Sequence, residues 1–281
     1  MNKKILSIPT ALLLQIIMLP AFAQVNDTAS QRLPDTVAFY SEGLQLKGLL
    51  WRPAGVGPFP GVLFNHGSES FIGKYLARIA PAFTSRGYAF FVPFRRGQGL
   101  SKGQGRYIGD EMDSALKTGG QALRFQVMMR LHQTSQLADQ KAGLNWLKTQ
   151  HDIDSSRLAV AGISFGGIQT MLMAGEDVGI RAALNFAGAA MAWDQSPEVG
   201  LWMKQLAAKA RVPVYFIQAA NDFSIEPSLQ ESQEMKRVGK PYQIKIYPPR
   251  GTTHMDGHIL VEETAAWGPD VFPQLDIWMK Q

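Results

Sequence analysis

The chain has 281 residues, of which 46% are apolar and 18% are charged, and this balance is typical of a globular protein with a substantial core. It contains no cysteine, which excludes disulfide bonds, thiolate nucleophiles and cysteine-ligated metals. The formal net charge is +5, but the basic residues are scattered, so the sequence offers no basic stripe for binding nucleic acid.

Residues 1–23 have the pattern of a secretory signal peptide. Two lysines precede an apolar segment, and the small residues Ala21–Ala23 stand where a signal peptidase reads. We therefore expect cleavage before Gln24, a periplasmic or secreted mature protein, and no stable membrane anchor after cleavage. The alternative is an N-terminal membrane anchor, although the apolar segment is short for a span and ends at Pro20.

The remaining apolar runs are short and mostly separated by helical patterns. Residues 36–40 and 44–53 alternate in polarity and predict an antiparallel hairpin. Six further strands are predicted at 60–67, 88–94, 157–164, 181–188, 213–222 and 242–248. Helices are predicted at 74–87, 138–150, 167–175, 226–239 and 267–281. This alternation predicts an α/β fold in one domain, 24–281, with an eight-stranded, mostly parallel sheet covered on both faces and its second strand antiparallel.

The segment at about 110–133 is additional to this alternation. It carries Met, Leu and Phe at helical spacing, and it lies between a strand and the helix that should follow directly. Two interpretations stay open for this helical insertion: a longer surface helix packed on the core, or a lid over a site. Its methionines, with Trp193 and Trp202, could line an apolar acyl or alcohol pocket or belong to the core.

A serine flanked by glycines is the first candidate for chemistry. Residues Gly162–Gly166 fit the pattern G-x-S-x-G, and they lie where a predicted strand ends and a predicted helix begins. Such a turn projects the serine hydroxyl above the carboxyl edge of the sheet, and the helix N-terminus favours negative charge there. We therefore expect Ser164 to be a nucleophile. The alternative is that these glycines only allow tight helix–sheet packing.

A serine needs a base, and the base needs a carboxylate that orients it. Of the five histidines, His132 and His151 are expected at the surface, whereas His254 and His258 lie in the loop after the last strand. We favour His258 as the base because it stands beside a glycine near the closing helix. Asp222 follows the preceding strand and is the expected acid, and its weaker rivals are Asp194, Asp256 and Glu226.

The loop after the strand at 60–67 is expected to complete the site. The backbone N–H groups of Ser68 and Phe165 are the predicted pair of donors to an oxyanion, and Gly67 lets the loop backbone point inward. We expect His66 to shape this loop by hydrogen bonding rather than to act as a base.

The glycine-rich run at 95–105 is not a dinucleotide-binding fingerprint. Lys102 occupies the place of the last glycine in G-x-G-x-x-G, and no acidic residue follows at the required distance after a helix. No metal-binding spacing is present in the sequence either, so we predict neither a cofactor nor a metal.

Five stretches together resemble the dienelactone hydrolase-like branch of the α/β-hydrolases. They are HGS, PFRRGQGLSKG, GISFGG, AAND and GHI followed by WGPDVFPQLDIWM, and the resemblance extends from about Phe39 to Met279. It implies an α/β-hydrolase fold, no cofactor, and a nucleophile, acid and base that match Ser164, Asp222 and His258. This chain departs from the cysteine enzymes of that branch by its serine.

The sequence therefore predicts an exported serine hydrolase that cleaves small-molecule carboxylic esters by a Ser-His-Asp acyl-enzyme mechanism. A serine peptidase or amidase of the same fold is the first alternative. The second is a non-catalytic binding protein on a hydrolase fold, against which the intact set Ser164, Asp222 and His258 argues. The sequence says nothing about the oligomeric state.

Overall fold

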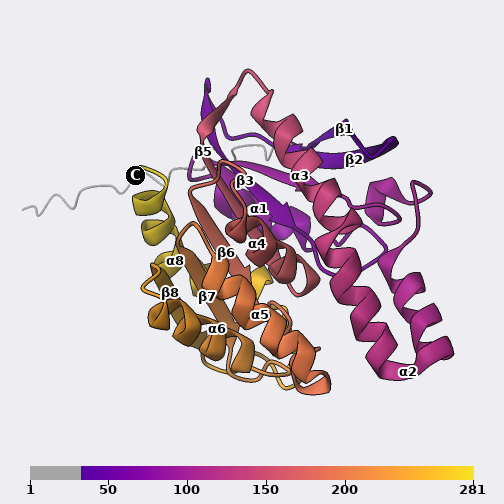
Figure 1. The fold of residues 1–281 in the computed structure, drawn as a ribbon. Coiled ribbons are helices and arrows are strands. Elements are labelled where there is room, and N and C mark those ends of the chain that lie inside the picture. Colours follow the sequence, from indigo (N-terminus) through magenta and orange to yellow (C-terminus); the bar gives the residue numbers. More distant parts are fainter. Residues whose placement is uncertain (1–32) are drawn as a thin grey trace, which may run out of the picture. The chain divides into compact units, whose positions relative to one another are not determined.

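The computed structural model describes residues 33–281, so the predicted signal peptide at 1–23 lies outside the described residues. An eight-stranded sheet has the order β1-β2-β4-β3-β5-β6-β7-β8 (Figure 1). The strands are β1 Asp35–Ser41, β2 Leu44–Trp51, β3 Phe59–Asn65, β4 Ala89–Pro93, β5 Ile153–Ile163, β6 Ala182–Phe186, β7 Val214–Ala219 and β8 Tyr242–Tyr247.

The predicted pairing of the strands is confirmed. β1 and β2 form the expected hairpin, and β2 runs antiparallel to both β1 and β4. The hairpin turns at Glu42 and Gly43, whose φ angles of 46° and 81° give the left-handed pair that a tight hairpin requires. From β4 through β8 all neighbouring strands are parallel, so the carboxyl ends of β3, β5 and β7 lie at one edge of the sheet.

Helices cover both faces of the sheet. The α-helices are α1 Leu76–Thr84, α2 Ile108–Gln133, α3 Ser135–Lys148, α4 Phe165–Gly175, α5 Pro197–Lys209, α6 Glu226–Arg237, α7 His254–His258 and α8 Thr264–Trp278. One apolar cluster packs α1 and α8 on one face, and the other packs α3, α4 and α5 on the opposite face. None of the helices between residues 33 and 281 is long and apolar enough to cross a membrane.

The additional helical segment is α2, which is longer than the predicted 110–133. Gly120 interrupts it with φ 73° and ψ −167°, so α2 consists of two helical segments. Its buried residues include Met112, Phe125 and Met128, and it packs against α3 and α4. The expectation that His132 is a surface residue is wrong, because its side chain is fully buried against α4. His151 is exposed, as expected.

Two helices were missed by the sequence analysis. α5 begins at Ser196, whose hydroxyl accepts a hydrogen bond from the Val199 N–H, and Pro197 occupies the first helical position. The short helix α7 lies in the segment expected to be a loop, and a capping box of Thr253 and Asp256 starts it. α7 matters for function because it carries both His254 and His258.

Candidate active site

Ser164 occupies a strained turn between β5 and α4. Its φ of 57° and ψ of −118° lie outside the regions that most side chains adopt, as expected for an exposed hydroxyl at a strand-to-helix turn. The turn requires glycine nearby: a Cβ atom at Gly166 would lie 1.8 Å from the Asn65 carbonyl oxygen. A Cβ at Gly162 would lie 2.3 Å from the Gly166 carbonyl oxygen. The glycines therefore let the turn approach both β3 and its own helix.

Asp222 and His258 form a buried hydrogen-bonded pair. The His258 Nδ1 atom lies 2.8 Å from Asp222 Oδ1, and the two residues are 5% and 4% exposed. The carboxylate also accepts hydrogen bonds from the Phe223 N–H at 2.7 Å and from Gln218 Nε2 at 2.8 Å. Because an ionised carboxylate only accepts, His258 Nδ1 carries the proton, and Nε2 is left with a lone pair that can take one.

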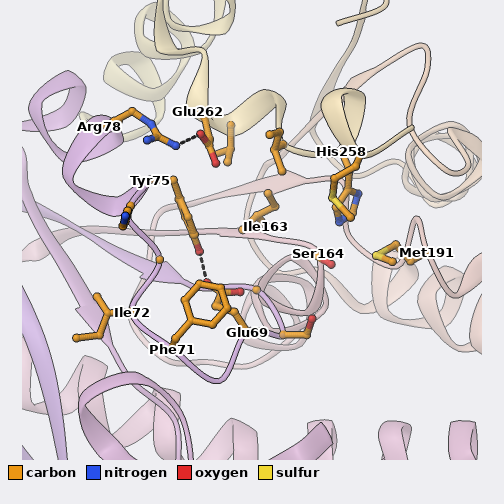
Figure 2. A pocket seen from close by; sticks show the side chains of 17 residues that line it. Glu69, Phe71, Ile72, Tyr75, Arg78, Ile163, Ser164, Met191, His258 and Glu262 are labelled. Carbon is orange, nitrogen blue, oxygen red and sulfur yellow. Dashed lines mark hydrogen bonds and ion pairs between the residues drawn. The ribbon is translucent and has the colours of Figure 1, made fainter. Parts of the chain in front are cut away.

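The free nitrogen of His258 and the hydroxyl of Ser164 belong to the same cavity. His258 Nε2 is buried and has no hydrogen-bond partner among residues 33–281. His258 and Ser164 both line a pocket of about 580 Å³ at the carboxyl edge of the sheet (Figure 2). The structure has no hydrogen bond between Ser164 Oγ and His258 Nε2, and such bonds commonly tighten only when a substrate is bound.

The rival candidates lie elsewhere. His254 is exposed, and its Nδ1 atom lies 3.1 Å from the Asn221 carbonyl oxygen. Asp256 accepts hydrogen bonds from the backbone N–H groups of Thr252 and Thr253, both at 2.9 Å, and so serves as a helix cap rather than as a partner of His258. Asp194 and Glu226 are exposed, and neither lines the pocket.

The predicted oxyanion donors are Ser68, in the loop after β3, and Phe165, which directly follows the nucleophile. Ser68 lines the pocket, and the Phe165 N–H is the first of α4, where helix geometry leaves it without an intrahelical acceptor. Neither N–H donates a hydrogen bond to another residue between 33 and 281. Two such amides beside a serine can stabilise a developing negative charge on oxygen.

His66 is part of the support of this loop. Its Nδ1 atom lies 3.0 Å from the Gly67 carbonyl oxygen, and its Nε2 accepts a hydrogen bond from the Arg95 N–H at 3.4 Å. Burial, with a smaller contribution from the Arg95 guanidinium, holds the pKa of His66 well below its usual value of 6.5. His66 is therefore neutral and hydrogen-bonded within the loop, as the sequence analysis expected.

Three consecutive carbonyl groups of the same loop are held by side chains from the glycine-rich run and the residues after it. Arg95 donates to the Gly67 carbonyl oxygen, Tyr107 Oη donates to that of Ser68, and Gln98 Nε2 donates to that of Glu69 at 2.8 Å. We call Arg95, Gln98 and Tyr107 the loop clamp. The sequence does not predict this role: the run was noted for its failed match to a dinucleotide fingerprint and for its family resemblance, and neither indicates hydrogen bonds to another loop.

Two of the three residues of the loop clamp, Arg95 and Gln98, are buried, and Tyr107 is half-buried. Arg95 is 1% exposed, and its Nε donates to Gln98 Oε1 at 3.0 Å, so two members of the clamp also hold each other. Burial lowers the pKa of Arg95 to about 10, which still leaves it charged at neutral pH. With its carbonyl groups held on one side, the loop directs the Ser68 region of its backbone toward the pocket.

The walls of the pocket come from the two segments expected to carry Ser68 and His258, although the sequence does not indicate which of their apolar residues line a cavity. One wall is the loop between β3 and α1, with Phe71, Ile72 and Tyr75, and the other is the segment Met255–Glu262. No residue of α2 lines the pocket, so α2 is the packed surface helix and not a lid in this structure. Trp193 and Trp202 are buried in the core and do not line the pocket either.

Between residues 33 and 281, no group of His, Asp and Glu side chains is arranged to hold a metal ion. The buried donors and acceptors around the nucleophile turn are instead protein groups: the Asp222–His258 pair, the two amides and the loop clamp.

Comparison with known proteins agrees with this architecture. Residues 46–255 match the model of the Dienelactone hydrolase family. A Bacillus subtilis (strain 168) protein named uncharacterized peptidase YtmA is 24% identical over 238 residues, which cover 75% of this chain and 83% of that protein.

Solved structures share the fold at lower identity. A putative dienelactone hydrolase from Klebsiella pneumoniae superposes with a TM-score of 0.62 at 19% identity, covering 89% of this chain and 98% of that one. An esterase from Pyrococcus furiosus gives 0.64 at 16% identity, covering 89% and 92%. Acylaminoacyl peptidase from Pyrococcus horikoshii gives 0.61 at 18% identity, covering 87% of this chain but only 41% of the peptidase.

Proposed function

The chain belongs to the dienelactone hydrolase family and is a hydrolase with the α/β-hydrolase fold, and from this premise we propose that it cleaves carboxylic esters through an acyl-enzyme on Ser164. The observation that carries the proposal is the buried Asp222–His258 pair. Its hydrogen bond leaves His258 Nε2 unpartnered in the pocket that Ser164 also lines. A neutral imidazole in that position can act as a general base.

The first half of the reaction forms the acyl-enzyme. Ser164 Oγ attacks the ester carbonyl carbon while its proton passes to His258 Nε2, and Asp222 stabilises the imidazolium that results. The negative charge that develops on the carbonyl oxygen is taken up by the N–H groups of Ser68 and Phe165. Collapse of this intermediate breaks the bond to the alkoxide, which leaves with the proton from His258 Nε2.

The second half releases the acid. Water attacks the acyl-enzyme carbonyl carbon and gives its proton to His258 Nε2, and the same two amides again hold the oxyanion. Collapse then returns the proton to Ser164 Oγ and frees the carboxylic acid. No group beyond the protein and water is needed to balance either half.

The test is ester hydrolysis by single variants. Replacing Ser164 or His258 with alanine removes one member of a unit, so each variant is expected to lose about 10⁶-fold in kcat. The assay is the rate of p-nitrophenol release from p-nitrophenyl acetate, which should be proportional to enzyme concentration. Circular dichroism shows whether each variant is folded. A folded Ser164→Ala protein with full activity would overturn the proposal.

A peptidase or amidase is the second candidate, because the curated relative is named a peptidase and acylaminoacyl peptidases share the fold. Both reactions use the same residues, so the site geometry does not separate them. Matched substrates do: an acyl p-nitrophenyl ester and the p-nitroanilide of the same acid differ only in the leaving atom. We expect the ester to be cleaved and the anilide to be cleaved slowly. Equal, Ser164-dependent cleavage of the anilide would favour the peptidase.

Export is a separate proposal that rests on residues 1–23 alone. Expression of the full chain in a Gram-negative host and N-terminal sequencing of the periplasmic product test it. The expected first residue is Gln24, whereas a full-length cytoplasmic product would contradict it.

A further inference from the structure

Four of the eleven large apolar side chains that are exposed between residues 33 and 281 line the pocket that contains Ser164. Large apolar side chains are seldom exposed together on a soluble protein unless they mark a binding surface. Four line this one pocket: Phe71 at 66% exposed, Ile72 at 41%, Met191 at 40% and Met255 at 46%. They come from three separate segments, the β3–α1 loop, the loop after β6 and helix α7. We call these four residues the apolar mouth.

The floor of the pocket continues this apolar character. Ile163 lines it beside Ser164, and Ile259 and Val261 extend the apolar lining along the wall formed by Met255–Glu262. Figure 2 shows Ser164, His258 and Met191 at one side of the pocket and Ile72 and Arg78 at the other, with Tyr75 and Glu262 between them. A chain attached to a carbonyl group at Ser164 would therefore have apolar side chains of this lining to lie against.

Three of the four Lys, Arg and Glu side chains that line the pocket are already hydrogen-bonded or ion-paired. Tyr75 Oη donates to Glu69 Oε1 at 2.6 Å, and Arg78 forms an ion pair with Glu262. Lys74 is the remaining charged residue of the lining, and its side chain is exposed to solvent. A charged substrate would have to give up its hydration without finding a free buried partner here, which is costly. The pairing therefore disfavours a charged substrate.

The size of the pocket agrees with an extended substrate. Its volume of about 580 Å³ is within the range of sites that enclose drug-sized molecules, and an acetyl group would leave most of the apolar lining uncovered. Each methylene group that moves from water to such a lining contributes favourably to binding.

We infer that the natural substrate is an uncharged ester with an aliphatic chain, and that the apolar mouth and the floor of the pocket bind this chain. The inference rests on the proposed ester hydrolysis and adds the substrate class to it. The chain can belong to the acyl part or to the alcohol part, since both are attached to the carbonyl group at Ser164. The chemistry that the pocket recognises is the same in either case.

Two ester series test the inference and distinguish the two sources of the chain. p-Nitrophenyl esters from acetate to octanoate lengthen the acyl part, and alkyl acetates from ethyl to octyl lengthen the alcohol. In at least one series kcat/KM is expected to rise about two- to four-fold per methylene as the chain is buried. If both series are flat while acetate hydrolysis depends on Ser164, the inference is wrong and the proposed function stands. If no ester is cleaved, both are wrong.

A charged analogue tests the second half of the inference. The mono-p-nitrophenyl ester of glutaric acid has the same chain length as p-nitrophenyl pentanoate but ends in a carboxylate. Because the pocket offers no free buried cation, kcat/KM for the charged ester is expected to be at least about ten-fold lower. Equal or faster cleavage of the charged ester would overturn the claim that the substrate is uncharged.

Variants of the apolar mouth test whether these residues cause the dependence of kcat/KM on chain length. In Phe71→Ser and Met255→Ser, the ratio of kcat/KM for the favoured octyl or octanoyl ester to that for the shortest ester should fall about five-fold or more, because apolar contact is lost. Leu201→Ser is the matched control: Leu201 is 57% exposed on α5 and does not line the pocket. It should keep the wild-type ratio. A wild-type ratio in both mouth variants would show that other residues bind the chain and would overturn this assignment.

Discussion

The two sides of the pocket are built in opposite ways. On the chemical side, Asp222 and His258 are almost fully buried, and three side chains hold the carbonyl groups of the oxyanion loop. The apolar mouth is the other side in its role, not in its position, and it projects Phe71 and Met255 into solvent. The chemical side is held by hydrogen bonds, whose strength depends on direction. The mouth offers apolar surface area, and contact with it does not depend on direction.

This contrast follows from what each side has to do. Stabilising charge in a transition state needs dipoles that are already in place, so their supports must be rigid and shielded from water. Binding an aliphatic chain needs only apolar area, which is roughly proportional to the surface removed from water and tolerates variation in shape. We therefore expect changes on the chemical side to slow every ester alike, whereas changes at the mouth alter the choice among esters.

After the loss of Ser164 or His258 itself, the largest effect is expected from Asp222→Asn. An asparagine amide would donate to His258 Nδ1 and force the proton to Nε2, which could then no longer accept one from Ser164. A loss of about 10⁴-fold in kcat is expected, the same for short and long esters. Asp256→Asn is the matched control, because Asp256 caps α7 and does not contact His258. It should change kcat by less than about three-fold and cost about 1 kcal/mol of stability at most. A larger loss of kcat in Asp256→Asn than in Asp222→Asn would indicate that Asp256, and not Asp222, orients His258.

A smaller effect is expected from Tyr107→Phe in the loop clamp. The change removes the hydrogen bond to the Ser68 carbonyl oxygen and leaves the ring in place. We expect kcat to fall about five- to thirty-fold with little change in KM, because an oxyanion donor becomes less well placed. Tyr40→Phe serves as the control, since Tyr40 is 70% exposed on β1 and does not line the pocket.

The chain-length ratio decides whether the clamp belongs to the chemical side. In Tyr107→Phe the ratio of octanoate to acetate activity should stay at the wild-type value. A changed ratio with an unchanged kcat for acetate would assign Tyr107 to substrate selection and remove the distinction between the two sides.

The smallest effect on catalysis is expected from α2, which belongs to neither side. Burial lowers the pKa of His132 to about 3, so the folded protein keeps this imidazole neutral. The unfolded chain takes up the proton as the pH falls below about 6.5, so His132 makes the folded state lose stability between about pH 6.5 and pH 3.

His132→Asn tests that dependence. The asparagine oxygen can accept the hydrogen bond that Gln169 Nε2 donates to His132 Nδ1 at 2.7 Å, but it does not titrate. The loss of unfolding free energy between pH 6.5 and pH 4.5, measured by urea denaturation, should shrink by about 1–3 kcal/mol. The ester chain-length ratio should not change. An unchanged pH dependence would mean that His132 is not held neutral.

A feature of the fold or the site can be predicted from the sequence where a local pattern of residues indicates it. The sheet follows from the alternation of strand and helix patterns along the chain. Ser164, Asp222 and His258 each follow a different parallel strand, and the carboxyl ends of parallel strands meet at one edge of the sheet. The hydrogen bond between Asp222 and His258 spans 36 residues, but chain order and topology suffice to anticipate it.

Contacts without a local signature were not anticipated. The Tyr107–Ser68 hydrogen bond joins residues 39 apart, and nothing in the spacing around Tyr107 indicates a partner in another loop. His132 was placed at the surface because the pattern of α2 does not reveal which of its faces packs on α4. Phe71 and Met255 were overlooked for the same reason: an apolar side chain in a loop says nothing about the cavity that it lines.

The nucleophile itself can be identified by fluorophosphonate labelling of the folded protein, followed by mass-spectrometric mapping of the modified peptide. We expect one modified residue, Ser164, with labelling abolished in Ser164→Ala and strongly slowed in His258→Ala but not in His254→Ala. Labelling at a different residue, or none in wild-type protein that is folded, would contradict it.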